Sequence, residues 1–249
     1  MTTNPFGIDL SRYQAPMYFD EVKASSMDVS FIAMRATISY AYKDPWFAEF
    51  WRETKRIGRH RMAYAVPYFG EDPQRQMDNL FETIVNPGWN QDRVVLELEL
   101  DHGHSKAVIT NKTKVMIDHC KRITGLYPII YTRKSWTDLH LDATQLPTLD
   151  WWLAHYLYSL PYPLYTPERK TPPALPIGVT DWLIHQNTCR GKSIGATSYY
   201  MDYNRWNGTI GEMDNYFGVA PPVVPDCEKE NGLLRADMAA INEITDRWV

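Results

Sequence analysis

The stretch "RVVLELELDHGH", residues 93–104, places two glutamates in a run that otherwise consists of Val and Leu. Its alternation is typical of a β-strand, in which successive side chains point to opposite faces. Val95, Glu97 and Glu99 would then share one face, and the two carboxylates would lie roughly 6–7 Å apart along the strand. Two interpretations follow: an amphipathic strand with a wet face, or a pair of catalytic acids at the mouth of a barrel.

Strand-like and helix-like segments alternate around this stretch. In the first half of the chain this alternation predicts a parallel sheet with crossover helices. A barrel that lacks helices in its later part would fit the rest. The expected strands cover residues 29–37, 61–69, 93–100, 127–132, 151–156, 182–187 and 198–204, and the expected helices cover 44–58, 72–85 and 111–125.

Composition and charge exclude several classes of protein. The chain has 249 residues, of which 44% are hydrophobic and 22% charged, and this is typical of a globular domain of barrel size. The net charge of −4, without any Lys/Arg-rich run, indicates no nucleic-acid partner. Three cysteines without paired spacing argue against a disulfide framework and a zinc cluster. We therefore expect no metal and no cofactor.

The end of the chain differs in composition from the rest. Residues 219–232 are first rich in Pro and then charged, which is typical of a linker. Leu234, Ile241 and Trp248 are then spaced by seven, as in an amphipathic helix. We expect a main domain at 1–218 and a linker with a helical tail at 219–249. The helix would either pack on the main domain or serve in self-association or docking through residues 233–249.

Polar and aromatic side chains recur where the apolar runs end. In β/α barrels this end of the strands forms the active site. Four of these side chains are carboxylates, namely Asp9, Glu97, Glu99 and Asp202. Crowding them in one barrel mouth would raise the pKa of at least one, and glycoside hydrolysis needs one protonated acid beside an ionised group. The candidate substrate-binding residues are Tyr64, Tyr68, Tyr131, His155, Tyr156 and Gln186.

The ordered set of motifs resembles that of the glycoside hydrolase family 25 lysozymes, which are N-acetylmuramidases. The resemblance covers about residues 5–210. It rests on "GIDLSRYQ" (7–14), "YKDPWF" (42–47), "LELE" (96–99), "PIIYT" (128–132), "WLAHY" (152–156), "WLIHQNT" (182–188) and "MDYN" (201–204).

The resemblance implies an α/β fold: a flattened, irregular, TIM-like β/α barrel of about five β/α units that continues mostly as β-strands, here with a C-terminal helical tail. It implies a peptidoglycan hydrolase that cleaves the β-1,4 bond between N-acetylmuramic acid and N-acetylglucosamine with retention, assisted by the substrate. The partner would be peptidoglycan glycan strands. Because we expect neither a signal peptide nor membrane insertion, the protein would be made in the cytoplasm and reach the wall after release or injection, as a phage lysin or a secreted effector does.

Position by position, Glu99 resembles the general acid/base of the family. Glu97 stands where the family has an aspartate that orients the 2-acetamido group of the substrate and stabilises its charge. Asp9 and Asp202 resemble the flanking carboxylates of the family site. The residues that resemble groups lining the sugar cleft are Tyr64, Tyr131 and Gln186.

The sequence departs from the family pattern at three positions: Glu97 replaces the aspartate, Ile38 stands where a glutamate is usual, and Ala65 stands where a histidine is usual. A shifted substrate, lowered activity and lost activity stay open. Two other functions stay open as well. One is a glycosidase for another N-acetylated polymer, and the other is a non-catalytic carbohydrate-binding or structural subunit of a phage or secretion particle.

Overall fold

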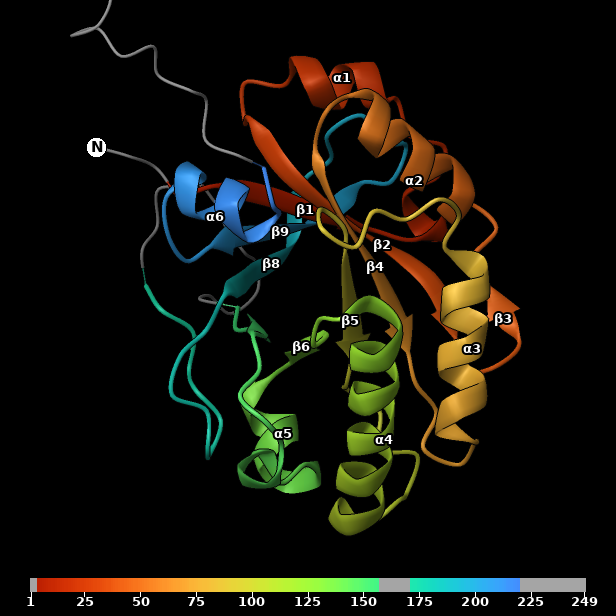
Figure 1. Ribbon diagram of the computed structural model, residues 1–249. Helices are drawn as coiled ribbons and strands as arrows, with labels where there is room; N and C mark the ends of the chain where they lie inside the picture. Colours follow the sequence, from red (N-terminus) through yellow and green to blue (C-terminus); the bar gives the residue numbers. More distant parts are fainter. Residues whose placement is uncertain (1–3, 157–170, 220–249) are drawn as a thin grey trace, which may run out of the picture. The chain divides into compact units, whose positions relative to one another are not determined.

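The computed structural model describes residues 4–156 and 171–219, which belong to one compact unit that ends at Val219. The expected tail helix lies outside the described residues. Figure 1 shows the arrangement of the elements in this unit. In chain order they are β1 (Phe6–Leu10), the 3₁₀ turn η1 (Arg12–Gln14), α1 (Phe19–Ala24), β2 (Val29–Ile38), β3 (Tyr42–Lys43), α2 (Phe47–Arg56), β4 (His60–Val66), α3 (Pro73–Thr83), β5 (Arg93–Glu97), α4 (Lys106–Thr124), β6 (Ile129–Thr132), α5 (Lys134–His140), η2 (Ala143–Gln145), β7 (Trp151–Ala154), β8 (Ile184–Lys192), β9 (Tyr200–Trp206) and α6 (Ile210–Tyr216).

Eight of the strands close into a barrel. The order β1-β9-β8-β7-β6-β5-β4-β2 is completed by the pairing of β1 with β2, and β3 extends β2 on the outside. Each neighbouring pair in the series β1, β2, β4, β5, β6, β7 and β8 is parallel. The last strand, β9, is antiparallel to both of its neighbours, β8 and β1. Five strand-then-helix units precede β7, so the expected fold class is confirmed.

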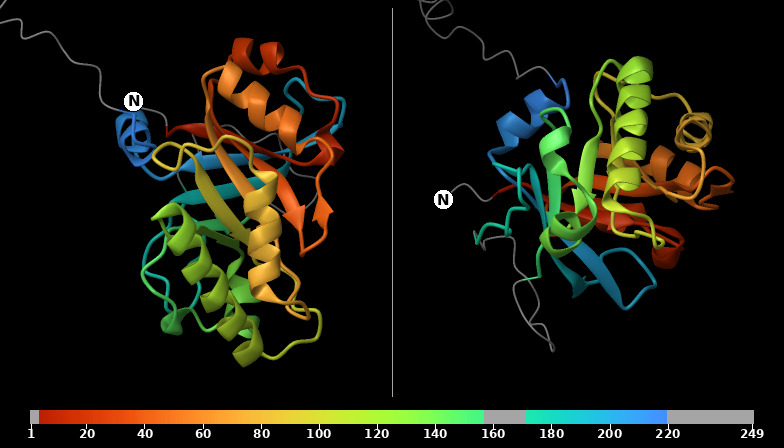
Figure 2. Two further views of the ribbon diagram at one scale, coloured as in Figure 1. Left: turned by 45° about the vertical axis from the view of Figure 1, so that its right-hand side comes forward. Right: turned by 90° about the horizontal axis from the view of Figure 1, so that it is seen from below.

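Helices cover the parallel strands from outside, and Figure 2 shows α2, α3 and α4 along that side of the barrel. Local sequence explains where they begin and end. Asp72 caps α3 by accepting hydrogen bonds from the backbone N–H groups of Gln74 and Arg75, and α4 ends at Gly125, which has φ +76°. Among the described helices, none is long and apolar enough to cross a membrane.

The alternation within β5 sorts its side chains between two cores. Val95 belongs to the core inside the barrel, together with Phe31 and Trp206. Leu96 and Leu98 belong to the core between the barrel and the helices. Leu100, which the strand pattern assigns to that same outer face, is instead 41% exposed because β5 ends at Glu97.

Candidate active site

Asp9 and Asp202 lie opposite each other where the barrel closes. They are direct partners in the antiparallel pairing of β1 with β9. Their side chains interact, and burial together with the neighbouring Asp9 raises the pKa of Asp202 well above its ordinary range. The Oδ2 atom of Asp9 also accepts hydrogen bonds from Asn204 Nδ2 at 2.7 Å and from Gln186 Nε2 at 3.0 Å. Two side-chain amides therefore fix the Asp9 carboxyl.

A second row of polar contacts fixes the amides that hold Asp9. Gln186 Oε1 accepts hydrogen bonds from the hydroxyl of Tyr131 at 2.8 Å and from that of Tyr156 at 3.0 Å. Trp152 Nε1 donates to Asn204 Oδ1 at 2.8 Å. Because each amide oxygen is occupied, each amide nitrogen is directed to Asp9.

The two central glutamates enter the same region from β5. Glu97 is the last residue of the strand. The backbone N–H of Leu98 donates to the carbonyl of Tyr131 at 2.8 Å, which prolongs the pairing with β6 beyond the strand. The chain therefore stays extended, and Glu99 comes to the same side of the sheet as Glu97. The amphipathic pattern thus directs both carboxylates inward at the carboxyl end of the parallel strands.

All four carboxylates line one cavity of about 210 Å³, here called the acidic cavity. Arg35 is paired with Asp44 at 2.8 Å, and its positive charge acts to lower the pKa of Glu97. The residues lining the acidic cavity are Asp9, Tyr64, Val95, Glu97, Glu99, Tyr131, Trp152, Tyr156, Gln186 and Asp202.

Crowding and burial raise the pKa values of these acids. Burial is the main cause for Glu97, and with the charges of Glu99 and Asp9 it raises the pKa of Glu97 to about 8. Burial also raises the pKa of Asp9 to about 6 and, with the adjacent Asp9, raises that of Asp202 well above its ordinary range. Burial raises the pKa of Glu99 above its ordinary value, and the positive charge of Arg133 offsets only part of this increase. The cavity therefore holds protons at neutral pH, and Glu97 holds one of them.

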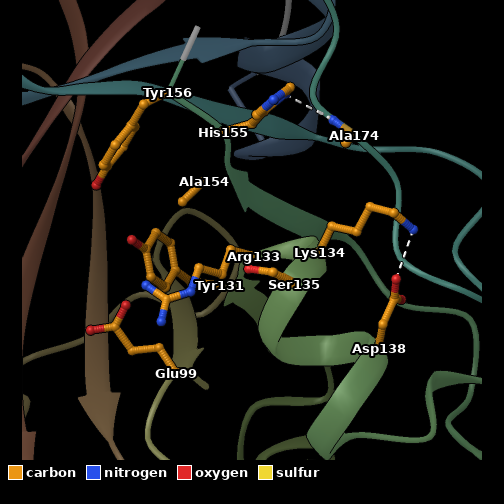
Figure 3. Close-up of a pocket in the computed structure, with 10 residues that line it drawn as sticks. All are labelled: Glu99, Tyr131, Arg133, Lys134, Ser135, Asp138, Ala154, His155, Tyr156 and Ala174. Atoms are coloured by element: carbon orange, nitrogen blue, oxygen red, sulfur yellow. Dashed lines mark hydrogen bonds and ion pairs between the residues drawn. The ribbon is translucent and has the colours of Figure 1, made fainter. Parts of the chain in front are cut away.

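A larger cavity of about 460 Å³ adjoins the acidic cavity and is here called the adjoining cavity (Figure 3). Glu99, Tyr131 and Tyr156 line both, so Glu99 lies at the boundary between them. The other residues lining the adjoining cavity are Arg133, Lys134, Ser135, Asp138, Ala154, His155 and Ala174.

Eight of the ten predicted site residues line the acidic cavity, and two do not. His155 lines the adjoining cavity, where its Nδ1 accepts a hydrogen bond from the backbone N–H of Ala174 at 3.1 Å. Tyr68 lines neither cavity. It is 38% exposed and packs against the ring of His102 at 4.2 Å between centroids, because the chain leaves the barrel after β4.

Two of the departures from the family pattern lie outside the acidic cavity. Ala65 faces the core between the barrel and the helices, so its lack of a long side chain does not change the cavity lining. Ile38 ends β2 and packs against the core inside the barrel. Glu97 is the departure that does alter the lining.

Sequence reasoning did not assign to the site three polar residues that act on the carboxylates, although Arg35 stood among the polar groups near the ends of the apolar runs. Asn204 follows Asp202 by two positions, so strand alternation could have identified it. Arg35 lies within β2, and its influence on Glu97 depends on how the strands are arranged in the barrel. Arg133 follows β6, and its charge partly offsets the rise that burial causes in the pKa of Glu99. Among the described residues, no group of three or more His, Cys, Asp or Glu side chains has a geometry that could hold a metal ion.

A family model, "Glycosyl hydrolases family 25", matches residues 8–196. This chain belongs to glycosyl hydrolase family 25. The matched range contains Asp9, Glu97 and Glu99, whereas Asp202 on β9 lies beyond it. Membership of the family makes the protein a glycoside hydrolase.

Individual members of family 25 are distant in sequence and close in fold. The chain is 25% identical to lysozyme M1 of Streptomyces globisporus over 227 residues, which cover 85% of this chain and 71% of that protein. The bacterial lysozyme from Streptomyces coelicolor superposes with a TM-score of 0.75 at 21% identity, over 88% of this chain and all of that one. A family 25 hydrolase from Bacillus anthracis superposes with a TM-score of 0.70 at 23% identity, over 86% of this chain and 94% of that one.

Proposed function

We propose that this family 25 enzyme is a lysozyme that cleaves the β-1,4 bond between N-acetylmuramic acid and N-acetylglucosamine in peptidoglycan. The family and its lysozyme and muramidase members support peptidoglycan hydrolysis. The observation that carries the proposal is the convergence of Asp9, Glu97, Glu99 and Asp202 in one cavity at the carboxyl end of the parallel strands.

Glu99 is the proposed general acid/base. It lies at the boundary of two cavities, so a sugar in each would place the bond between them at its carboxyl. Its raised pKa favours the protonated form that a leaving group needs. Glu99 donates this proton to the glycosidic oxygen and then takes one from the incoming water, as the two steps of a retaining mechanism require.

Glu97 is the proposed partner of the charge that develops on the sugar. The substrate's own acetamido carbonyl would attack the anomeric carbon, which is a known exception to the scheme with two carboxylates. A nearby positive charge favours the ionised form of an acid, so the ring cation would draw Glu97 from its neutral resting state towards the carboxylate. Asp9 and Asp202 complete the charge pattern, and Tyr64, Tyr131, Tyr156 and Gln186 line the sugar site.

We also propose that residues 1–218 form the catalytic domain and that residues 219–249 form a linker and an amphipathic helix for self-association or docking. The support is the composition of the tail, with its prolines, its charges and its apolar spacing of seven.

A digestion experiment tests the proposed reaction. Purified peptidoglycan is incubated with the protein, the products are reduced with borohydride, and mass spectrometry identifies the reducing sugar. A muramidase yields reduced N-acetylmuramic acid, and NMR of the fresh product shows the β-anomer if the configuration is retained. Release of reduced N-acetylglucosamine, or faster cleavage of chitin fragments than of peptidoglycan, would contradict the proposal.

A further inference from the structure

Arg133 is a cation at the edge of the active site. The register pairs Glu97 with Tyr131, so Glu99 and Arg133 each lie two residues beyond these partners on neighbouring strands. Figure 3 shows the guanidinium of Arg133 beside the Glu99 carboxyl. Arg133 nevertheless forms no hydrogen bond or ion pair through its side chain with any residue in the described part of the chain.

Lys134 and Asp138, which also line the adjoining cavity, are paired with each other. Lys134 Nζ is 2.8 Å from Asp138 Oδ2 and donates to the carbonyl of Leu175 at 2.9 Å. Asp138 also accepts a hydrogen bond from the backbone N–H of Ile177 at 2.7 Å. These two charges cancel. When Glu99 holds the proton of the proposed general acid, Arg133 therefore leaves the lining of the adjoining cavity with a positive charge at the boundary with the acidic cavity.

We propose that Arg133 binds a carboxylate on the 3-O-lactyl arm of the muramic acid unit, and so selects peptidoglycan over uncharged N-acetylated glycans. This inference rests on the proposed muramidase function. An anionic arm is disfavoured in the acidic cavity, because burial penalises its charge and any ionised carboxyl there repels it. The arm would instead extend past Glu99 into the adjoining cavity, whose volume of about 460 Å³ is in the range of ordinary ligand sites.

The planar guanidinium suits this task because its N–H groups match the two oxygens of a carboxylate. The carboxylate has two sources in peptidoglycan. It is the lactyl carboxyl itself where no peptide is attached, and it is a carboxyl of the stem peptide where one is. Chitin has neither group, so Arg133 would contribute nothing to binding chitin.

The test uses three forms of the same glycan strands: with stem peptides, stripped of peptides by an amidase, and stripped with the lactyl carboxyl then coupled to methylamine. The variants are Arg133→Gln and Arg133→Lys. The control is Arg52→Gln, because Arg52 is 69% exposed on α2 and pairs with its neighbour Glu53.

We expect Arg133→Gln to raise KM about tenfold on an anionic form, since a charged hydrogen bond contributes about 1.5 kcal/mol or more, with little change in kcat. The form on which KM rises identifies the source of the carboxylate. On the methylamide form the variant should match the wild type, and Arg133→Lys should keep part of the effect. An equal loss of kcat on all three forms, with a shifted pH profile, would overturn the inference by showing that Arg133 acts only through Glu99. Unchanged kinetics on all three forms would also overturn it.

A binding measurement separates this inference from the proposed function. Calorimetry of the Glu99→Gln full-length chain is carried out with the soluble disaccharide of N-acetylglucosamine and N-acetylmuramic acid, and with its methylamide. A preference for the free carboxylate that disappears when Arg133→Gln is added supports the role of Arg133 even if the wild type cleaves no substrate. Equal affinity for both sugars refutes that role even if the wild type is an active muramidase.

Discussion

Glu99 lines both cavities and is the general acid/base of the proposed reaction. Replacing it with Gln keeps the size of the side chain and removes the proton donor. We expect kcat of Glu99→Gln on peptidoglycan to fall by roughly 10²–10⁴-fold, with KM little changed, as measured by release of reducing sugars. Glu82→Gln is the matched control, since Glu82 lies on α3, is 72% exposed and lines neither cavity. Unchanged turnover in Glu99→Gln would exclude Glu99 as the acid.

Glu97 should make the stability of the protein depend on pH. Its pKa is raised from the ordinary 4.5 to about 8 in the folded state, so between these values the folded chain binds more protons than the unfolded chain. Stability therefore falls as pH rises from about 4.5 to 8. Glu97→Gln removes this loss of stability. At pH 8 its Tm should exceed that of the wild type by about 2–4 °C for each kcal/mol of unfolding free energy that the ionisation of Glu97 costs.

The same pair of proteins should have nearly equal Tm values near pH 4, where Glu97 is protonated in both the folded and the unfolded state. Calorimetric scans at several pH values measure the difference, with Glu82→Gln again as the control. A constant difference across the whole pH range would show that Glu97 ionises as an exposed acid does.

Single residues also mark the limit of inference from sequence. Strand alternation correctly placed Glu97 and Glu99 on one face, because a period of two is a local property. The interactions of Asp44 were local only in part, because its Oδ1 accepts a hydrogen bond from the backbone N–H of Trp46 at 3.1 Å. The Asp-Pro pattern predicts Asp44 as a helix cap, but α2 begins at Phe47, and the carboxyl of Asp44 pairs with Arg35 at 2.8 Å.

At the scale of elements, β1 depends on a residue without a side chain. Gly7 points into the barrel, where a Cβ atom would collide with the ring of Phe31. The ring is fully buried and packs edge to face with Trp206, so it has little room to move. The tight contact between β1 and β2, which positions Asp9, therefore requires glycine at residue 7.

Gly7→Ala should destabilise the fold by about 1–3 kcal/mol, the usual cost of overpacking, as measured by urea denaturation. Gly211→Ala is the control because its added methyl would have no heavy atom within 4 Å, and alanine favours a helix such as α6. The double variant Gly7→Ala, Phe31→Leu should recover part of the loss. A Gly7→Ala protein as stable as the wild type would show that the interior is not closely packed at this point.

Sequence patterns identified most of these elements, and their failures have a physical cause. The runs that became β6, β7, β8 and β9 were recognised from local apolar character. The short helices α1, α5 and α6 were not predicted, since six or seven residues give too little periodicity to recognise. Tyr68 was assigned to the site from its place after an apolar run, but the path of the chain beyond a strand depends on tertiary packing.

At the scale of the whole molecule, every residue assigned to the proposed reaction lies before Val219. We expect a chain that ends at Val219 to cleave soluble peptidoglycan fragments with kcat within about a factor of two of the full chain, a difference of about 0.4 kcal/mol. Light scattering of both chains would test whether residues 233–249 cause self-association. A truncated chain that folds but has lost kcat would contradict the proposed division at residue 218.

The antiparallel strand β9 brings Asp202 and Asn204 to Asp9, which lies nearly two hundred residues earlier in the chain. Synthesis of the protein therefore ends its barrel with the same strand that supplies the last acidic group. A ribosome that stalls before this strand releases a product with an open sheet edge and an incomplete set of acids. On the proposed roles of these acids, a fragment that ends before β9 would lack both Asp202 and the hydrogen bond from Asn204 to Asp9, so we expect hydrolytic activity only once this last strand is in place.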